Sequence, residues 1–189
     1  MNEDGFRALW PTLFLQRVLP SAETANKVLL KHILETDDAK EQLTTDYQSQ
    51  NLFEQKHPAL QWLRQCIYKT IADYLAESGV TVDVSWSLQG WANINRQGDY
   101  HSLHNHPYSY LSGTYYINTP QQAKAENQRN DINPGDISFF DPRAQANMTA
   151  LAGDSQYDPE LRISPEPGLL LLWPSFLHHF VHPLSLIHI

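Results

Sequence analysis

The sequence predicts a mainly β fold with helices in its N-terminal third, either a helix-flanked β-sandwich or a barrel. Up to about residue 80, apolar side chains recur at helical spacing, and from Val80 onward they alternate with polar ones. Proline, glycine and asparagine residues typical of turns separate the short apolar runs that follow. Double sheets of this kind close or cover their edges and leave a cavity at one mouth, which is a natural place for a metal.

The N-terminal third is predicted to hold one short strand and two helices. Residues 11–19 begin with proline and carry β-favouring side chains, which indicates a strand or an edge segment. Apolar residues at helical spacing predict helices over 22–36 and 58–77. The polar residues 37–56 between them predict a loop.

The rest of the chain, residues 81–189, is predicted to form the β core, and residues 1–80 to pack on it as an extension within a single structural domain. Polar segments at 121–132 and 144–160 are predicted to be surface loops that shape a substrate pocket. Six other runs have the pattern of strands, because they alternate or are short and apolar. They are 82–88, 91–95, 108–117, 136–140, 168–173 and 176–181.

The composition excludes several function classes. The net charge of −8 argues against DNA or RNA as the main partner, because phosphate binding needs a basic patch. The single cysteine, Cys66, cannot form an internal disulfide, and the N-terminal residues show no signal-peptide pattern. The longest apolar stretch, Gly168 to Trp173, is too short to span a bilayer. We therefore expect a cytoplasmic protein that binds neither nucleic acid nor a membrane.

Six of the nine histidines lie in two short clusters. In the first cluster, His104 and His106 are two residues apart, and side chains at this spacing point the same way on an extended segment. The second cluster, Trp173 to His182, enters a predicted strand about seventy residues later and can supply a third ligand. Three facial ligands leave positions open for a cosubstrate and oxygen. An isolated H-x-H is usually a surface feature, and spacing alone leaves iron, zinc and manganese open.

Several motifs stand in a fixed order between residues 82 and 183, and their ordered combination is more specific than any one of them. They are Trp91-Ala92-Asn93, Gly98, His104-Asn105-His106-Pro107, Leu111-Ser112-Gly113-Thr114-Tyr115-Tyr116, the segment from Gly135 to Arg143 and the segment from Pro165 to Val181. In this order the sequence resembles the 2-oxoglutarate- and iron(II)-dependent oxygenases found in bacteria and phages.

The resemblance implies a double-stranded β-helix, a cupin-like jelly roll, that holds iron(II) at its open end. His104 would be the proximal ligand and His179 the distal one, while His178 and His182 fit the motif less well. His106 stands where the wider superfamily often has a carboxylate, so it is the expected third ligand. The remaining alternatives for that ligand are Asp99 and Asp141.

The resemblance also implies 2-oxoglutarate as a cosubstrate that chelates the iron, together with O2. Asn95 and Tyr116 are in positions similar to those that line the cosubstrate pocket, whereas Tyr115 is expected to pack in the core. The arginine that usually binds the far carboxylate, about ten residues beyond the distal histidine, is absent from this sequence. We expect residues 184–189 to depart from the native family sequence.

The implied activity is hydroxylation of an unactivated C–H bond in an amino acid, a peptide or a small metabolite. Trp86, Trp91 and Trp173 are expected to supply apolar lining. The alternative is a degenerate cupin-like module that binds a metal or ligand without catalysis. A third possibility is a cupin-type dioxygenase that uses three histidines and no 2-oxoglutarate. The residues indicate neither the substrate nor the oligomeric state.

Overall fold

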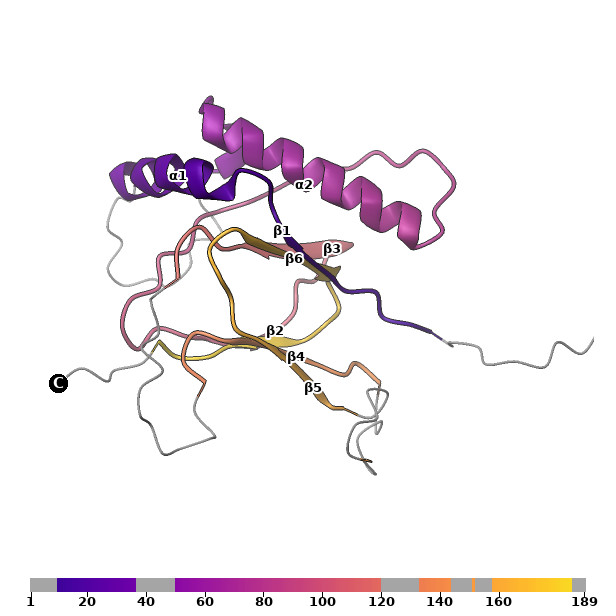
Figure 1. Cartoon of the computed structure of the whole chain (residues 1–189). Helices are drawn as coiled ribbons and strands as arrows, with labels where there is room; N and C mark the ends of the chain where they lie inside the picture. The colour runs from indigo at the N-terminus through magenta and orange to yellow at the C-terminus, as the bar shows by residue number, and fades with distance from the viewer. Residues whose placement is uncertain (1–9, 37–49, 120–132, 144–150, 152–157, 185–189) are drawn as a thin grey trace, which may run out of the picture.

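The computed structural model describes residues 10–36, 50–119, 133–143, 151 and 158–184. They form two antiparallel β-sheets that lie one above the other, with two helices over the outer face of one sheet (Figure 1). The mainly β class with N-terminal helices is therefore confirmed. The predicted loops at 121–132 and most of 144–160, and residues 185–189 of the tail, lie outside the described residues. None of the described helices combines the length and apolar character needed to cross a membrane.

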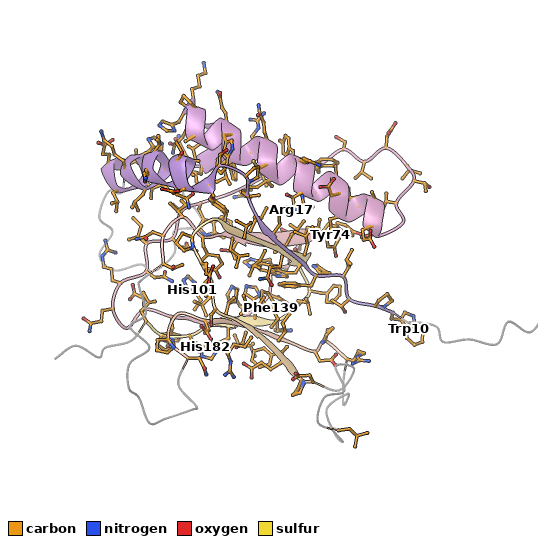
Figure 2. All side chains as sticks on the ribbon, in the orientation of Figure 1. Trp10, Arg17, Tyr74, His101, Phe139 and His182 are labelled. Atoms are coloured by element: carbon orange, nitrogen blue, oxygen red, sulfur yellow. The ribbon has the colours of Figure 1, made fainter. Side chains whose placement is uncertain are left out.

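Both predicted helices form with the predicted bounds. They are α1 (Ala22–Thr36) and α2 (Pro58–Glu77), and a single 3-10 turn, η1 (Leu52–Glu54), precedes α2. Pro58 suits the first turn of α2 because its missing N–H would have no helical partner there. Arg17 and Tyr74, labelled in Figure 2, tie α2 to the chain leading into the sheet: Arg17 binds Asp73, and the Tyr74 hydroxyl donates to the carbonyl of Leu13.

The sheet beneath the helices has three strands in the order β1 (Leu15–Val18), β6 (Leu169–Pro174) and β3 (Leu111–Tyr115). The central strand β6 is covered on both faces. Leu170 and Leu172 pack against side chains of the helices, whereas Leu169, Leu171 and Trp173 belong to the core between the sheets. Burial on both faces explains why this strand is a continuous apolar run.

The second sheet has four strands in the order β2 (His101–His104), β7 (His179–Val181), β4 (Ile137–Phe140) and β5 (Glu160–Ile163). Ile137 and Phe139 point from β4 into the core and meet Leu169, Leu171 and Trp173 of the other sheet. Each fully buried side chain of this size stabilises the fold by about 1.5–3 kcal/mol. This core holds the two sheets together and fixes the distance between their facing strands.

The strands predicted at 82–88 and 91–95 are wrong, because the structure has no strand between α2 and β2. The backbone there binds the η1 segment instead: the Asn51 side chain donates to the carbonyl of Leu88, and Leu52 N–H donates to the carbonyl of Gly90. Val82 is 71% exposed, so the alternating pattern does not mark a buried face.

Strand β5 was missed, because its first residue lies in the predicted loop 144–160 and its other residues were left unassigned. Two other predicted strands are shorter than expected. The run 108–117 becomes β3 only from Leu111, since Tyr108 has a positive φ of 70°. The run 176–181 becomes β7 only from His179, because the chain first turns at 174–177, where Leu177 N–H donates to the carbonyl of Pro174.

Candidate metal centre

Three histidines from two remote segments meet at the end of the β2–β7 ladder. His104 is the last residue of β2 and is the register partner of His179, the first residue of β7. His106 follows two residues after His104. Each of the three offers one ring nitrogen, and these nitrogens all lie within 4.8 Å of one another. The ring centroids are 4.2 Å apart for His104 and His179, and 5.1 Å for His106 and either of the others.

The turn between β6 and β7 positions His106 beside His179. The backbone N–H of His106 donates to the backbone carbonyl of Ser175 over 3.1 Å, and the backbone N–H of Ser175 donates to the backbone carbonyl of Tyr110. The Ser175 hydroxyl lies 2.7 Å from the hydroxyl of Ser112 on β3. Ser175 is buried, so these bonds are sheltered from water. The Pro174-Ser175 turn therefore holds the H-x-H segment against the strand that carries His179.

Two of the rings are oriented by backbone carbonyls. His104 Nδ1 lies 2.6 Å from the carbonyl of Ser102, and His179 Nδ1 lies 3.1 Å from the carbonyl of Leu177. A carbonyl only accepts, so each Nδ1 must carry the proton when the bond forms. The Nε2 lone pair of each neutral ring is then free to bind a metal, and such partners raise the basicity of the ligand.

Burial favours the neutral imidazole at His106 and His179. The pKa of His179 is lowered from 6.5 to about 4, mainly by burial and in part by the neighbouring histidines, while the bond to the Leu177 carbonyl opposes the shift. Burial likewise lowers the pKa of His106, with a smaller contribution from His104. Metal ligation needs the neutral ring, so at neutral pH no proton has to be displaced from these two side chains.

The donor set fits a first-row transition metal. Imidazole suits iron, zinc, copper and nickel, whereas magnesium and calcium prefer oxygen ligands. Three protein ligands leave coordination positions open, as a catalytic site requires, while a structural site is closed by four. His104, His106 and His179 form the one group of three potential ligands within the described ranges.

Neither aspartate alternative lies in this group. The Asp99 carboxylate accepts from Arg96 N–H over 2.6 Å and closes the turn at Gly98. The Asp141 carboxylate binds Arg143 over 2.7 Å, and this partner lowers its pKa. The structure therefore does not bring either aspartate to the two clustered histidines His104 and His179.

The two neighbouring histidines of the second cluster also lie outside the group of three. His178 is exposed. His182 Nε2 lies 2.7 Å from the buried Ser138 hydroxyl, so its ring is engaged with the β4 strand. Figure 2 shows His182 at the four-stranded sheet and Phe139 in the core between the sheets.

The comparison with known families decides the assignment of the chain. A family described as "Putative 2OG-Fe(II) oxygenase" matches residues 89–186, which is more than half of the sequence. The chain belongs to this family. A comparison with curated proteins finds no significant match. The matched range contains all three clustered histidines, so the resemblance found in the motifs and the geometry found in the structure concern the same residues.

The two residues expected to line the cosubstrate pocket of this 2OG-Fe(II) oxygenase family member lie in different places. Tyr116 packs against the core between the sheets, and burial raises its pKa well above the usual range. Asn95 contacts a histidine instead: its Oδ1 lies 3.1 Å from Nε2 of His101. Tyr115 faces the helices, where its ring meets Trp62 and its hydroxyl donates to Asn26, so its expected role in core packing is confirmed.

His101 was not selected from the sequence, although it stands in the first cluster. Its ring centroid is 6.4 Å from that of His104, and burial lowers its pKa. Residues three apart on a regular strand point to opposite faces. A register shift between His101 and His104 breaks that rule here, and a bulge of this kind has no reliable signal in the sequence.

Two of the three expected lining tryptophans lie beside the histidines. The Trp173 ring is 5.0 Å from His179, and the Trp91 ring is 6.4 Å from His106. Trp86 instead packs edge-on against Tyr68 of α2 and is 40% exposed.

Proposed function

We propose that the chain is an iron(II)- and 2-oxoglutarate-dependent oxygenase that hydroxylates an unactivated C–H bond of an amino acid, a peptide or a small metabolite. The observation that carries this proposal is the convergence of His104, His106 and His179 inside the range that matches the family. Structural zinc sites usually have four ligands, and this group offers three.

The strand order supports a double-stranded β-helix as the finer fold. In the second sheet the early strands β2 and β4 flank the late strand β7, and in the first sheet β3 lies beside β6. Jelly rolls interleave strands from both halves of the chain in two facing antiparallel sheets. Such a fold gathers residues from remote strands at one mouth, as the β2–β7 ladder does for the histidines.

In this proposal His104, His106 and His179 hold the iron. Iron(II) with 2-oxoglutarate and O2 supplies the oxidant for the C–H bond. Because His106 replaces a carboxylate by a neutral imidazole, the centre keeps one more positive charge than an H-x-D site, which favours an anionic cosubstrate and alters the oxygen chemistry. Tyr116 would line the cosubstrate pocket, and Asn95 would act through His101.

The protein also has to keep water away from the metal. Trp91 lies beside His106, Trp173 lies beside His179, and Trp173 is 2% exposed. A closed apolar wall strengthens electrostatic interactions at the metal and prevents side reactions. In this proposal the two tryptophans help to position the rings of His106 and His179 and to exclude solvent from the metal.

A second candidate is a metal- or ligand-binding module without 2-oxoglutarate chemistry. One observation favours it: no lysine or arginine is among the buried residues of the described chain, so a buried carboxylate would lack the usual cation. The same observation agrees with a three-histidine dioxygenase, because an enzyme that needs no 2-oxoglutarate needs no buried cation for its far carboxylate. Both alternatives predict metal binding without cosubstrate binding.

The test is a pair of measurements on the purified full chain. Elemental analysis after loading with iron(II) gives the metal content, and anaerobic titration with 2-oxoglutarate gives cosubstrate binding. The proposal expects one iron per chain, cosubstrate binding only with the metal present, and iron-dependent release of succinate and carbon dioxide in air. Iron-loaded protein that neither binds nor turns over 2-oxoglutarate would leave the metal-binding module as the better account.

The substrate class and the location are also part of this proposal. The acidic chain, with its net charge of −8, favours a small molecule or a peptide over a nucleic acid. A cytoplasmic location agrees with the single Cys66.

A further inference from the structure

Trp173 carries a buried indole N–H that has no hydrogen-bond partner. Its Nε1 is one of two such side-chain atoms in the described part of the chain, and the whole residue is 2% exposed. Native proteins pair nearly all buried polar groups with protein, water or ligand. An indole nitrogen only donates, so the missing partner must be an acceptor.

The Trp173 side chain lies next to the candidate metal centre. Its ring lies 5.0 Å from the ring of His179 and 4.8 Å from that of Phe139, and it stacks at 6.3 Å with Phe14. It therefore contacts both the candidate metal ligand His179 and the apolar core. A ligand held at His179 and extending toward the core between the sheets would lie close to this side chain.

The strand beside Trp173 adds hydroxyl groups on the same face. Ser112 is the register partner of Trp173, and Thr114 is that of the core residue Leu171. Cross-strand partners share a face of the sheet, and side chains two apart along a strand do as well. Ser112, Thr114 and Tyr116 therefore follow one another on the inner face of β3, and the Tyr116 side chain is hydrogen-bonded to Thr114.

For the far carboxylate of the cosubstrate, the described interior offers neutral hydrogen-bond donors in place of the arginine that the family usually has. Several arginines are engaged with acids outside the core: Arg17 with Asp73, Arg143 with Asp141 and Arg162 with Glu160. A carboxylate buried without partners is very costly, so its oxygens would have to be met by N–H and O–H groups. The unpaired Trp173 N–H is a donor that is available without breaking a bond seen among the described residues.

We propose that Trp173 Nε1–H donates a hydrogen bond to the far carboxylate of the bound 2-oxo acid, beside the hydroxyls of Thr114 and Tyr116. This rests on the proposed function, because it takes 2-oxoglutarate as the ligand. Trp173 is then a specificity-determining residue: it distinguishes a diacid from a 2-oxo acid that lacks the second carboxylate. The metal-chelating end of the ligand is common to both and is unaffected.

The test compares Trp173→Phe, which keeps an aromatic ring and removes the N–H, with the wild type. Iron(II)-loaded protein is titrated without oxygen with 2-oxoglutarate and with 2-oxobutyrate, which lacks the far carboxylate, and binding is followed by the charge-transfer absorption of the iron–oxo acid complex. Loss of a hydrogen bond to a charged group should weaken 2-oxoglutarate binding about tenfold or more. Binding of 2-oxobutyrate and of the metal should stay unchanged. Trp62→Phe, at the helix–sheet contact, is the matched control.

A second measurement needs no variant to fold. The wild type is loaded with zinc, so that no turnover occurs, and its five indole N–H signals are followed by NMR while 2-oxoglutarate is added. One signal should shift. It should be the signal most protected from hydrogen exchange, as expected for the buried Trp173.

Each outcome decides one question. The role of Trp173 is overturned if Trp173→Phe weakens the binding of both acids equally, or of neither, and the indole signal of the wild type does not move. These results leave the proposed function standing. A wild type that binds metal and neither acid overturns the proposed function, and this inference falls with it.

Discussion

His104 and His179 are register partners across the β2–β7 ladder, and their ring centroids lie 4.2 Å apart. Directly opposite residues in an antiparallel pair have their Cβ atoms within about 4.5–5.5 Å. The ladder therefore fixes the separation of two candidate ligands before a metal arrives. His106 then completes the group through its backbone bond to Ser175. The candidate centre is built from sheet geometry and one turn.

His179→Ala should abolish tight metal binding, because it removes the one ligand that projects from the second histidine cluster. We expect the affinity for iron(II) or zinc to fall by at least about a hundredfold, more than the loss seen when only an outer partner of a ligand is removed. Competition with a chromogenic chelator measures this. The matched control is His178→Ala, which removes an exposed ring from the adjacent position. Equal affinities in the two variants would contradict the assignment of His179.

His106→Asp should keep the metal, whereas His106→Ala should lose it. The aspartate restores the carboxylate of the common H-x-D pattern and neutralises one positive charge of the centre. Carboxylates suit manganese better than imidazole does, so we expect the affinity for manganese relative to zinc to rise in His106→Asp. Parallel titrations of the wild type and both variants check this. An unchanged metal affinity in His106→Ala would exclude His106 as a ligand.

The helices and the central strand were predictable because their signals are local or very strong. In α2, the helical apolar spacing and Pro58 act within a few residues of one another. In β6, burial by helices on one face and by a sheet on the other leaves an apolar run with no polar residue between Leu169 and Trp173. The H-x-H segment and the second histidine cluster were recognisable from spacing and from family resemblance.

The errors come from interactions that the sequence does not encode locally. Strand β5 is paired with β4 and exposes Leu161 and Arg162, so it has no apolar run to mark it. Residues 82–95 alternate as a strand does, but the backbone at Leu88 and Gly90 bonds to the η1 segment. The approach of His101 to the centre depends on a register shift that only the β2–β7 pairing reveals.

The stability of the metal-free protein should fall as the pH is lowered from about 6.5 to about 4, in part because of His179. Burial lowers the pKa of this ring to about 4 from an unfolded value of 6.5, so in that window the unfolded chain binds more protons than the folded chain. The stability that depends on a neutral His179 is fully present above pH 6.5 and is lost as the pH falls toward 4. A shift of this size corresponds to about 3 kcal/mol.

Denaturant unfolding of the wild type and of His179→Gln over this range measures the effect. Glutamine does not titrate, so the free energy of unfolding of the wild type should decline relative to the variant as the pH falls. Carboxylates titrate in both proteins and cancel in the difference. Parallel curves would show that His179 is not held neutral by burial. Bound zinc should steepen the wild-type curve, because protons compete with the metal for the ring.

Asn26→Ala should destabilise the fold without affecting the metal centre. Asn26 is 7% exposed; its Nδ2 donates to the carbonyl of Ile117 over 2.9 Å, and its Oδ1 accepts from the Tyr115 hydroxyl over 2.6 Å. Removing the side chain leaves both groups unpaired at the contact between α1 and the end of β3. We expect a loss of about 2 kcal/mol in the free energy of unfolding, and a smaller loss of about 1 kcal/mol for Tyr115→Phe, which leaves the bond to Ile117 intact.

The double variant distinguishes a shared bond from two separate effects. Once Asn26 is gone, the half-buried Tyr115 hydroxyl has lost its partner, so Tyr115→Phe should cost little or should even stabilise the protein. The coupling energy should therefore exceed about 0.5 kcal/mol, whereas independent sites add to within about 0.3–0.5 kcal/mol. Zinc affinity should match the wild type in all three variants, because Tyr115 faces the helices while Tyr116 faces the core. A loss of zinc binding in Tyr115→Phe would mean that the two faces of β3 are not independent.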